Sequence, residues 1–219
     1  YAELRRLDEP YFYKSADAYL LSRYSDVEAA ARNPTLVRSL EAFMNPGAVN
    51  AQQRARDWHD MPNHERFVQF SLLERDGATH FRLRVIVLRA LSRRLVEQQR
   101  GMIQKYVDQL LDQLLQHREF DFVADLASHV PGHIIGHLLG VPDEDCPQLR
   151  IWSENIVQFF DAERTPAHKL LAENATTEFY FYLSGLIADR RNKPQEDLIS
   201  SLVAAQEAGE MTELELIST

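Results

Sequence analysis

Cysteine is nearly absent from this sequence, because Cys146 is the only one among 219 residues. One thiol cannot form a disulfide within the chain, so the sequence favours a reducing compartment and we expect a cytoplasmic protein. Long apolar runs are absent as well. No stretch approaches the roughly 18 residues that a membrane-spanning helix needs, and no signal-peptide pattern opens the chain, so we expect no membrane partner.

Several motifs that mark catalytic or phosphate-binding sites are also absent. The sequence has no glycine-rich phosphate loop, no nucleophile elbow and no pair of cysteines at metal-ligand spacing. The net charge is −9, from 24 Lys and Arg against 33 Asp and Glu. A chain this acidic is a poor candidate for nucleic-acid binding, and we expect no nucleic-acid partner.

Positive charge is concentrated in one part of this acidic chain. Residues 79–118 hold eight basic and three acidic residues, whereas residues 119–219 hold six basic and eighteen acidic residues. The overall composition, 45% apolar and 26% charged, is typical of a soluble globular protein. We therefore expect one surface of a globular domain to face an anion or an acidic partner.

The pattern of apolar residues predicts a mainly α-helical fold with a small β-unit near the N-terminus. Two short strands are expected within residues 10–23, where β-forming residues flank a polar turn. Residues 35–78 lack periodicity and contain proline and glycine, so we expect a long loop. Residues 79–219 show helical spacing. We expect residues 1–219 to form a single domain.

Polar residues mark where the helices are expected to begin. Ser25 should cap a short helix, Thr79 a helix that runs to about residue 91, and Ser92 a long helix after it. Thr212 is expected to cap the last helix, with Glu215 in the capping-box position.

His80 and Arg84 are the first candidate binding residues. Their i, i+4 spacing places both side chains on the same face of a helix. Apolar residues fill nearly all sides of that helix, which predicts a largely buried element. A buried charge needs a partner, and a bound carboxylate or phosphate would supply one. The alternative is a solvated helix face with no ligand.

His129, His133 and His137 form a stripe at i, i+4 and i+8, and such imidazoles can share a transition metal. Pro131 interrupts the stretch and no carboxylate joins the same face in sequence, so we interpret them as half-buried histidines and predict no metal site. Cys146 follows three acidic residues, whose charges should raise the pKa of the thiol and disfavour its use as a nucleophile.

Five segments carry a family resemblance that runs along the whole chain. They are, in order, "YSDVEAAARNP", "DGATHFRLRVIVLRALS", "FDFVADLASHVPGHIIGHLLGVP", "PQEDLISSLVAA" and "MTELELI". Their order resembles the N-terminal half of a soluble, bacterial-type cytochrome P-450, a haem-thiolate monooxygenase. The strongest element is the pattern D-x-x-x-H-x-x-x-R, formed by Asp76, His80 and Arg84. The family usually has a proline after that aspartate, where this chain has Gly77.

The resemblance implies a haem b cofactor whose propionates His80 and Arg84 would hold. It also implies a bacterial, secondary-metabolic enzyme that hydroxylates or epoxidises an apolar organic molecule with O2. Electrons would come from a ferredoxin- or flavodoxin-like protein, and Arg89, Arg93 and Arg94 are the expected contacts with that donor.

The resemblance also assigns substrate-binding residues. Phe67, Val68 and Phe70 would close over the substrate, and helices around Phe160 and Phe179 would form a lid. Ordinary core packing of these aromatics is the alternative.

The catalytic centre is expected beyond residue 219. The family's central helix, its Glu-x-x-Arg pair and the loop with the iron-ligating cysteine have no match here, and Cys146 stands in the wrong context to replace that ligand. Two alternatives remain open. One is a haem-free, degenerate helical module that binds a partner or an apolar ligand, and the other is a helical protein with a histidine-bound metal.

Overall fold

The chain folds into two compact units, Tyr1–Met44 and Asn45–Thr219. The computed structural model describes residues 1–14, 17–39, 44–45, 47–48, 60–117, 119–160 and 165–219. The single domain expected over residues 1–219 stays a prediction. Among the described residues, none of the helices combines the length and the apolar character that crossing a membrane requires.

The first unit contains the expected β-unit. Its elements are the 3-10 turn η1 (Leu4–Arg6), strands β1 (Tyr11–Tyr13) and β2 (Ala18–Leu20), and helix α1 (Tyr24–Arg32). The strands pair antiparallel, and the rings of Phe12 and Tyr19 meet across them with centroids 5.1 Å apart. Both strands lie within residues 10–23, as predicted. The predicted cap at Ser25 is wrong, because α1 begins at Tyr24 and no side chain caps it.

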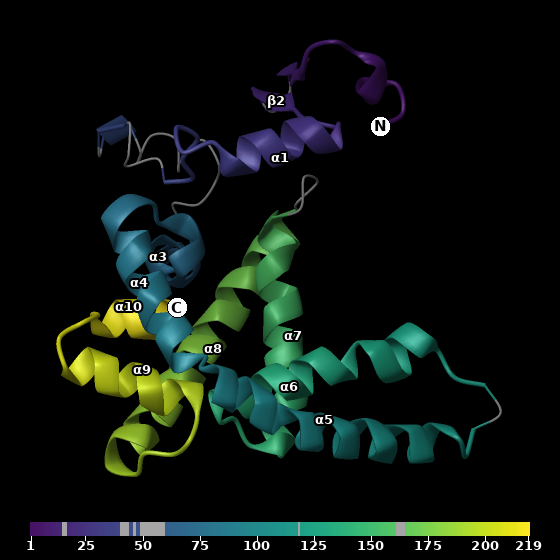
Figure 1. Ribbon diagram of the computed structural model, residues 1–219, viewed down its shortest axis with the longest axis vertical. Coiled ribbons are helices and arrows are strands. Elements are labelled where there is room, and N and C mark those ends of the chain that lie inside the picture. Colours follow the sequence, from purple (N-terminus) through teal and green to yellow (C-terminus); the bar gives the residue numbers. More distant parts are fainter. Residues whose placement is uncertain (15–16, 40–43, 46, 49–59, 118, 161–164) are drawn as a thin grey trace. The chain divides into compact units, whose positions relative to one another are not determined.

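The regular elements that the structure describes in the second unit are all helices (Figure 1). Its elements are α3 (Pro62–Phe70), η4 (Leu72–Glu74), α4 (Gly77–Ala90), α5 (Arg93–Leu114), the π-helix η5 (Phe122–Ala127), α6 (His129–Leu139), η6 (Asp143–Asp145), α7 (Cys146–Val157), η7 (Gln158–Phe160), α8 (Pro166–Asn192), α9 (Leu198–Glu207) and α10 (Glu213–Ser218). The prediction of a mainly α fold with a small β-unit is confirmed.

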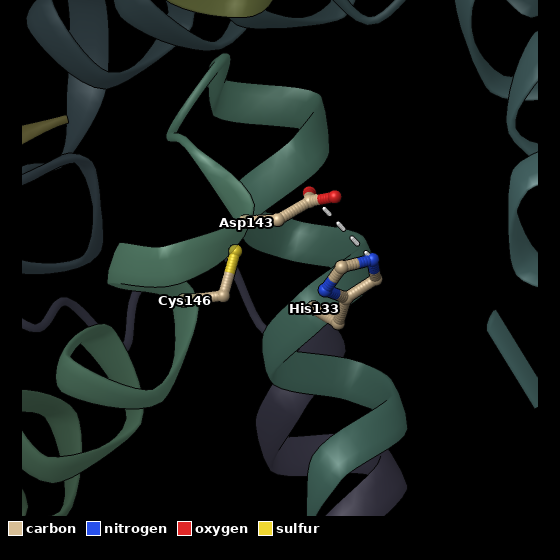
Figure 2. Close-up of side chains that lie close together, drawn as sticks. All are labelled: His133, Asp143 and Cys146. Carbon is tan, nitrogen blue, oxygen red and sulfur yellow. Dashed lines mark ion pairs between the residues drawn. The ribbon is translucent and has the colours of Figure 1, made fainter. Parts of the chain in front are cut away.

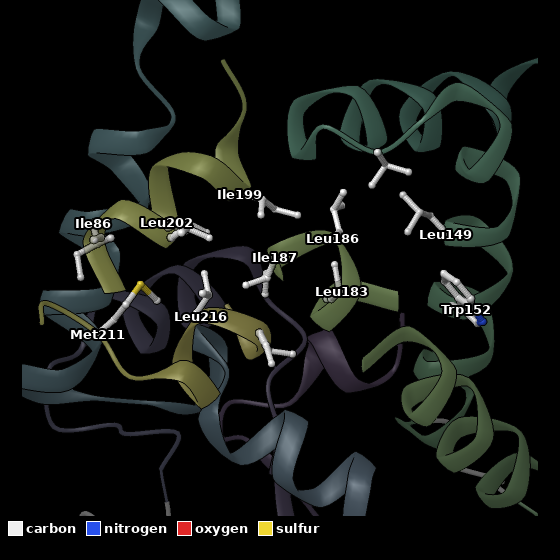
Figure 3. Close-up of a cluster of buried hydrophobic side chains, with 14 of the residues drawn as sticks. Ile86, Leu149, Trp152, Leu183, Leu186, Ile187, Ile199, Leu202, Met211 and Leu216 are labelled. Atoms are coloured by element: carbon white, nitrogen blue, oxygen red, sulfur yellow. The ribbon is translucent and has the colours of Figure 1, made fainter. Parts of the chain in front are cut away.

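Helix α8 supplies the centre of the core in this unit. Leu183, Leu186 and Ile187 recur at i, i+3 and i+4, which turns them toward one side of the helix. Figure 3 shows these side chains between Trp152 of α7 and Ile199 of α9. Each fully buried aliphatic side chain of this kind stabilises the fold by about 1.5–3 kcal/mol relative to an exposed one.

Part of the expected loop over residues 35–78 is helical, so that prediction is wrong for α3 and η4. Residues 40–43, 46 and 49–59 of the segment lie outside the described residues. Helix α3 begins at Pro62, which suits a first turn because proline has no N–H to leave unpaired. The carboxylate of Glu173 on α8 accepts hydrogen bonds from the backbone N–H groups of Asn63 (3.1 Å) and His64 (2.9 Å). A distant helix therefore supplies the cap of α3.

Two of the remaining predicted caps are confirmed. The Ser92 hydroxyl accepts from the Leu95 N–H at the start of α5, and Thr212 and Glu215 form a full capping box on α10. The cap predicted at Thr79 is wrong, because α4 already begins at Gly77.

Candidate functional site

The start of α4 is shaped by a glycine. Asp76 stands in the N-cap position, and Gly77 follows it with φ +61°. Proline could not adopt that angle, because its ring fixes φ near −65°. Gly77 therefore allows a backbone conformation that a proline at this position would prevent.

The inner face of α4 is anchored by packing and by one ion pair. Leu83 and Ile86 are buried in the core. The Arg82 guanidinium donates to both carboxylate oxygens of Glu215, at 2.6 Å and 3.2 Å, and to the Glu210 carbonyl at 2.7 Å. Burial alone would raise the pKa of Glu215, but the hydrogen bonds from Arg82 and from the Thr212 N–H hold it below its usual value. These contacts join α4 to the start of α10.

The outer face of α4 is exposed and mainly apolar. Phe81, Arg84, Val85 and Leu88 recur at i, i+3, i+4 and i+7, so they form one stripe along the helix. Phe81 is 69% exposed, Val85 44% and Leu88 56%, and Arg84 is also exposed. The prediction that this helix is buried on nearly all sides is therefore wrong, because only the opposite side packs against the core.

His80 and Arg84 differ in their surroundings. His80 is half-buried, and its Nδ1 lies 3.1 Å from the Leu72 carbonyl, which can only accept a hydrogen bond. Nδ1 therefore carries a proton, and Nε2 can also donate only if the ring is protonated. Arg84 has no hydrogen bond or ion pair with any of the residues that the structure describes. A cation free to bind thus stands within an exposed apolar stripe.

The three arginines expected to contact an electron donor already have partners. Arg89 pairs with Glu210, Arg93 with Glu97 at 2.7 Å and Arg94 with Glu196 at 3.5 Å. The local surplus of positive charge in the sequence is thus partly neutralised within the fold. This weakens the argument that the arginines steer an acidic protein, although their side chains remain exposed.

The predicted substrate-binding residues do not gather at one place. Phe67 of α3 faces Phe179 of α8, with ring centroids 6.0 Å apart, and both line an apolar cavity of about 150 Å³. Val68 is buried. The guanidinium carbon of Arg75 lies over the Phe70 ring, 5.2 Å from the ring centroid. Phe160 of η7 is 51% exposed and stands near His64, with ring centroids 5.8 Å apart.

Sequence reasoning overlooked a buried histidine. The His64 side chain is fully buried, and its Nδ1 lies 3.1 Å from the Thr176 hydroxyl on α8. Burial lowers the pKa of His64 to about 4, although the Glu173 carboxylate acts in the opposite direction. Nothing in the sequence around His64 indicates a partner that lies 112 positions later.

The histidine stripe on α6 has one unexpected neighbour. His137 binds Gln99 through Nδ1 at 2.8 Å, whereas His133 Nε2 lies 3.8 Å from a carboxylate oxygen of Asp143. The expectation that no carboxylate joins this face is therefore wrong, because the chain turns back after α6. Cys146 lies in the same group, as Figure 2 shows.

Cys146 is the first residue of helix α7, and its side chain is buried. Burial is the main cause that raises the pKa of its thiol, and Asp143, Asp145 and Glu144 raise it further. The predicted direction of the pKa shift is confirmed, although the acidic neighbours are the smaller cause.

Comparison with known proteins connects this arrangement to one family. No protein-family model matches the chain. Over 217 residues it is 33% identical to the polyketide biosynthesis cytochrome P450 PksS of Bacillus subtilis strain 168, covering 99% of the chain and 49% of that protein. It is also 33% identical over 207 residues to nocardicin C N-oxygenase of Nocardia uniformis subsp. tsuyamanensis, covering 93% of the chain and 47% of that protein.

The fold agrees with the sequence comparison. The crystal structure of CalO2 superposes with a TM-score of 0.84 at 25% identity, and the match covers 100% of this chain and 52% of that one. The chain spans about half the length of the curated relatives it matches. By sequence and by fold, this chain corresponds to the N-terminal half of a bacterial cytochrome P450.

Proposed function

We propose that the complete protein is a haem-dependent monooxygenase, in which the outer face of α4 binds the carboxylates of the haem. The single observation that carries this proposal is the stripe of Phe81, Arg84, Val85 and Leu88, with His80 one turn before Arg84. A soluble helix normally turns such a stripe toward the core. Here the core lies on the other side of the helix, so the stripe is available to a ligand or to further protein.

The chemistry of that face fits a haem. A porphyrin offers a broad apolar surface with carboxylates at one edge, and the stripe offers apolar side chains together with two cationic or potentially cationic groups. The Arg84 fork is suited to a carboxylate, because its donors match both oxygens. At His80, Nδ1 keeps its bond to the Leu72 carbonyl, so Nε2 is the ring nitrogen left to contact a carboxylate.

A bound haem supplies the O2 chemistry, and the protein supplies binding, orientation and electrostatics. In this chain His80 and Arg84 perform the binding part, and no catalytic residue is proposed among residues 1–219. The iron-ligating cysteine is proposed to lie beyond residue 219. Cys146 is not proposed for that role, because it opens α7 after three acidic residues, a context different from the ligand loop of the family.

The substrate is proposed to be an apolar organic molecule. The two relatives named above carry names that refer to polyketide biosynthesis and to oxygenation of nocardicin C. Phe67, Val68, Phe70 and Phe160 remain the proposed substrate-binding residues. The Phe67 and Phe179 pair at the cavity gives Phe67 the strongest geometric support of the four.

The electron donor is proposed to be a ferredoxin- or flavodoxin-like protein, and the cytoplasm is the proposed location. Exposed Arg89, Arg93 and Arg94 are the proposed contacts, although each is paired within the chain. Steering by exposed charges weakens as salt rises, because the screening length is about 8–10 Å near physiological ionic strength. The reduction rate should therefore fall between low and high salt, and an unchanged rate would argue against steering.

A spectrum of the complete protein tests the proposal. After reduction and exposure to carbon monoxide, a haem-thiolate enzyme shows the absorption band typical of thiolate-ligated iron. A haem-free helical module, the second candidate, would show no haem absorption. We expect the thiolate band in the complete protein, its absence when residues 1–219 are produced alone, and its persistence in the Cys146→Ser variant. Loss of the band in that variant would overturn the placement of the ligand beyond residue 219.

A further inference from the structure

Three side chains that can bind a metal meet where α6 gives way to α7. His133 comes from α6, Asp143 opens η6, and Cys146 is the first residue of α7; Figure 2 shows the three side chains close together, with a dashed line between His133 and Asp143. One ligand atom from each lies within 4.8 Å of the other two. The turn that joins them depends on Gly140, whose φ of +82° reverses the chain after α6.

The three ligand atoms, all within 4.8 Å of one another, are close enough for small shifts to bring them around one ion. His133 Nε2 and Asp143 Oδ1 are 3.8 Å apart, which is too long for a hydrogen bond. Two ligands of a tetrahedral zinc ion lie about 3.4–3.6 Å apart, given zinc–ligand bonds of about 2.0–2.3 Å. The Asp143 side chain is 73% exposed, so it can move the remaining fraction of an ångström without disturbing the core.

The other two ligands are held in place by packing. The His133 ring stacks on Tyr106, with centroids 3.7 Å apart and an angle of 9° between the planes. The Cys146 sulfur occupies space left by Gly136, where an added Cβ would lie 2.5 Å from Sγ. Cys146 is 4% exposed and His133 is 9% exposed. An ion would therefore meet two ligands that are already ordered and one that is adjustable.

A cavity gives an ion access to this group. Its volume is about 300 Å³, and its lining includes His129, His133, Asp143 and Cys146. The space leaves room for a water molecule as a fourth ligand. Arg150 also lines the cavity, but its guanidinium is paired with Glu154 at 2.7 Å, and the carboxylates of η6 add negative charge nearby.

We propose that His133, Asp143 and Cys146 bind one Zn²⁺ ion, with water in the fourth position. The combination of imidazole, thiolate and carboxylate suits zinc, whereas Mg²⁺ and Ca²⁺ prefer ligands that are all oxygen. The ion would displace the thiol proton to solvent and join α6 to α7. This revises the prediction that the chain has no metal site.

Zinc content is the first measurement. The complete, haem-containing protein is dialysed against buffers of fixed free zinc, and zinc and iron are determined separately by elemental analysis. The parent protein should hold one zinc per chain. His133→Ala and Cys146→Ser should each weaken zinc binding at least tenfold, since altering even an outer-shell partner typically costs about 10–100-fold. His117→Ala is the matched control, because it removes an exposed imidazole outside the group and should bind zinc as the parent does.

Alkylation of Cys146 is the second measurement, read by peptide mass. Zinc should slow alkylation in the parent and in His117→Ala, and should have no such effect in His133→Ala. If Cys146→Ser does not fold, judged by circular dichroism, His133→Asn and Asp143→Asn replace it. The proposal would be overturned if the parent bound no zinc. It would also be overturned if zinc affinity were unchanged in the His133 and Asp143 variants, or if zinc did not slow the alkylation of Cys146. None of these outcomes depends on whether the protein carries haem.

Discussion

The Arg82 guanidinium donates hydrogen bonds to both carboxylate oxygens of Glu215, although 133 positions separate the two residues in the sequence. This pair fixes the inner side of α4, and Arg84 stands two residues later on the outer side without a partner among the described residues. Two arginines in one turn of helix therefore have different roles, one structural and one available for a ligand.

Replacing Arg82 should destabilise the fold. Arg82→Ala leaves the mostly buried Glu215 carboxylate without its partner, which costs about 3–5 kcal/mol for a fully buried pair. The Arg82 side chain is 41% exposed, so solvent screening reduces the expected loss to about 1–2 kcal/mol. Urea unfolding of the haem-free protein measures it. Arg84→Ala is the matched control and should change the unfolding free energy by less than about 0.5 kcal/mol. Equal losses in both variants would contradict the structural role of Arg82.

Gly140 should tolerate no side chain. Its φ is +82°, and a Cβ would lie 2.0 Å from Asp197 Oδ2, within the pair that Asp197 forms with Arg190 at 2.5 Å. Gly140→Ala should therefore cost at least about 3 kcal/mol, because it combines backbone strain with the disruption of a buried ion pair. Gly101→Ala is the comparison, since beyond its own stretch of helix no atom of the described residues lies within 4 Å of the added Cβ. That variant should gain about 0.5–1 kcal/mol from helix propensity. A neutral Gly140→Ala would contradict the packing at this turn.

The buried His64 should make stability depend on pH. Its pKa is about 4 in the folded protein and near 6.5 when exposed, so the unfolded state binds more protons between these values. Stability from this residue is complete above about pH 6.5 and is lost as pH falls toward 4, by on the order of 3 kcal/mol. Unfolding free energies at several pH values, compared with those of His64→Gln, isolate the effect. Parallel pH curves for the two proteins would rule it out.

Phe67 should contribute more to substrate binding than Val68. Phe67 lines the apolar cavity opposite Phe179, whereas Val68 is buried in packing. In the complete protein, Phe67→Ala should weaken the substrate-induced spectral shift at least about tenfold, which corresponds to 1.4 kcal/mol. Val68→Ala should chiefly lower stability, by about 1.5–3 kcal/mol, because it removes two buried methyl groups. Phe70→Ala should also alter substrate selectivity. Unchanged shifts with Phe67→Ala and Phe70→Ala would remove both residues from the proposed site.

Local signals explain which parts of the fold could be predicted. The caps at Ser92 and Thr212 can be predicted from the sequence, because the side-chain acceptor and the backbone N–H that it binds lie three residues apart. The predictions at Ser25 and Thr79 are wrong, because α1 and α4 begin before these residues and neither N-cap residue forms a side-chain cap bond. The cap of α3 cannot be predicted from the local sequence, since the capping carboxylate of Glu173 comes from another helix.

The candidate sites also depend partly on local spacing and partly on distant residues. The shared face of His80 and Arg84 follows from helical spacing alone, but the side of α4 that meets the core does not. That side is set by partners such as Glu215, far away in the sequence. The meeting of His133 with Asp143 likewise depends on the reversal at Gly140, which helical periodicity does not describe.

Haem retention tests the central claim most directly. The complete protein and its Arg84→Ala, His80→Ala and double variants are compared by the rate at which haem passes to an excess of an acceptor protein. Hydrogen bonds to charged groups contribute about 1.5–3 kcal/mol each, so each single variant should lose haem roughly tenfold to a hundredfold faster. Arg100→Ala removes an exposed arginine from α5 and should retain haem as the parent does. A double variant that keeps its haem as long as the Arg100→Ala control would contradict the assignment of α4 as the haem-binding face.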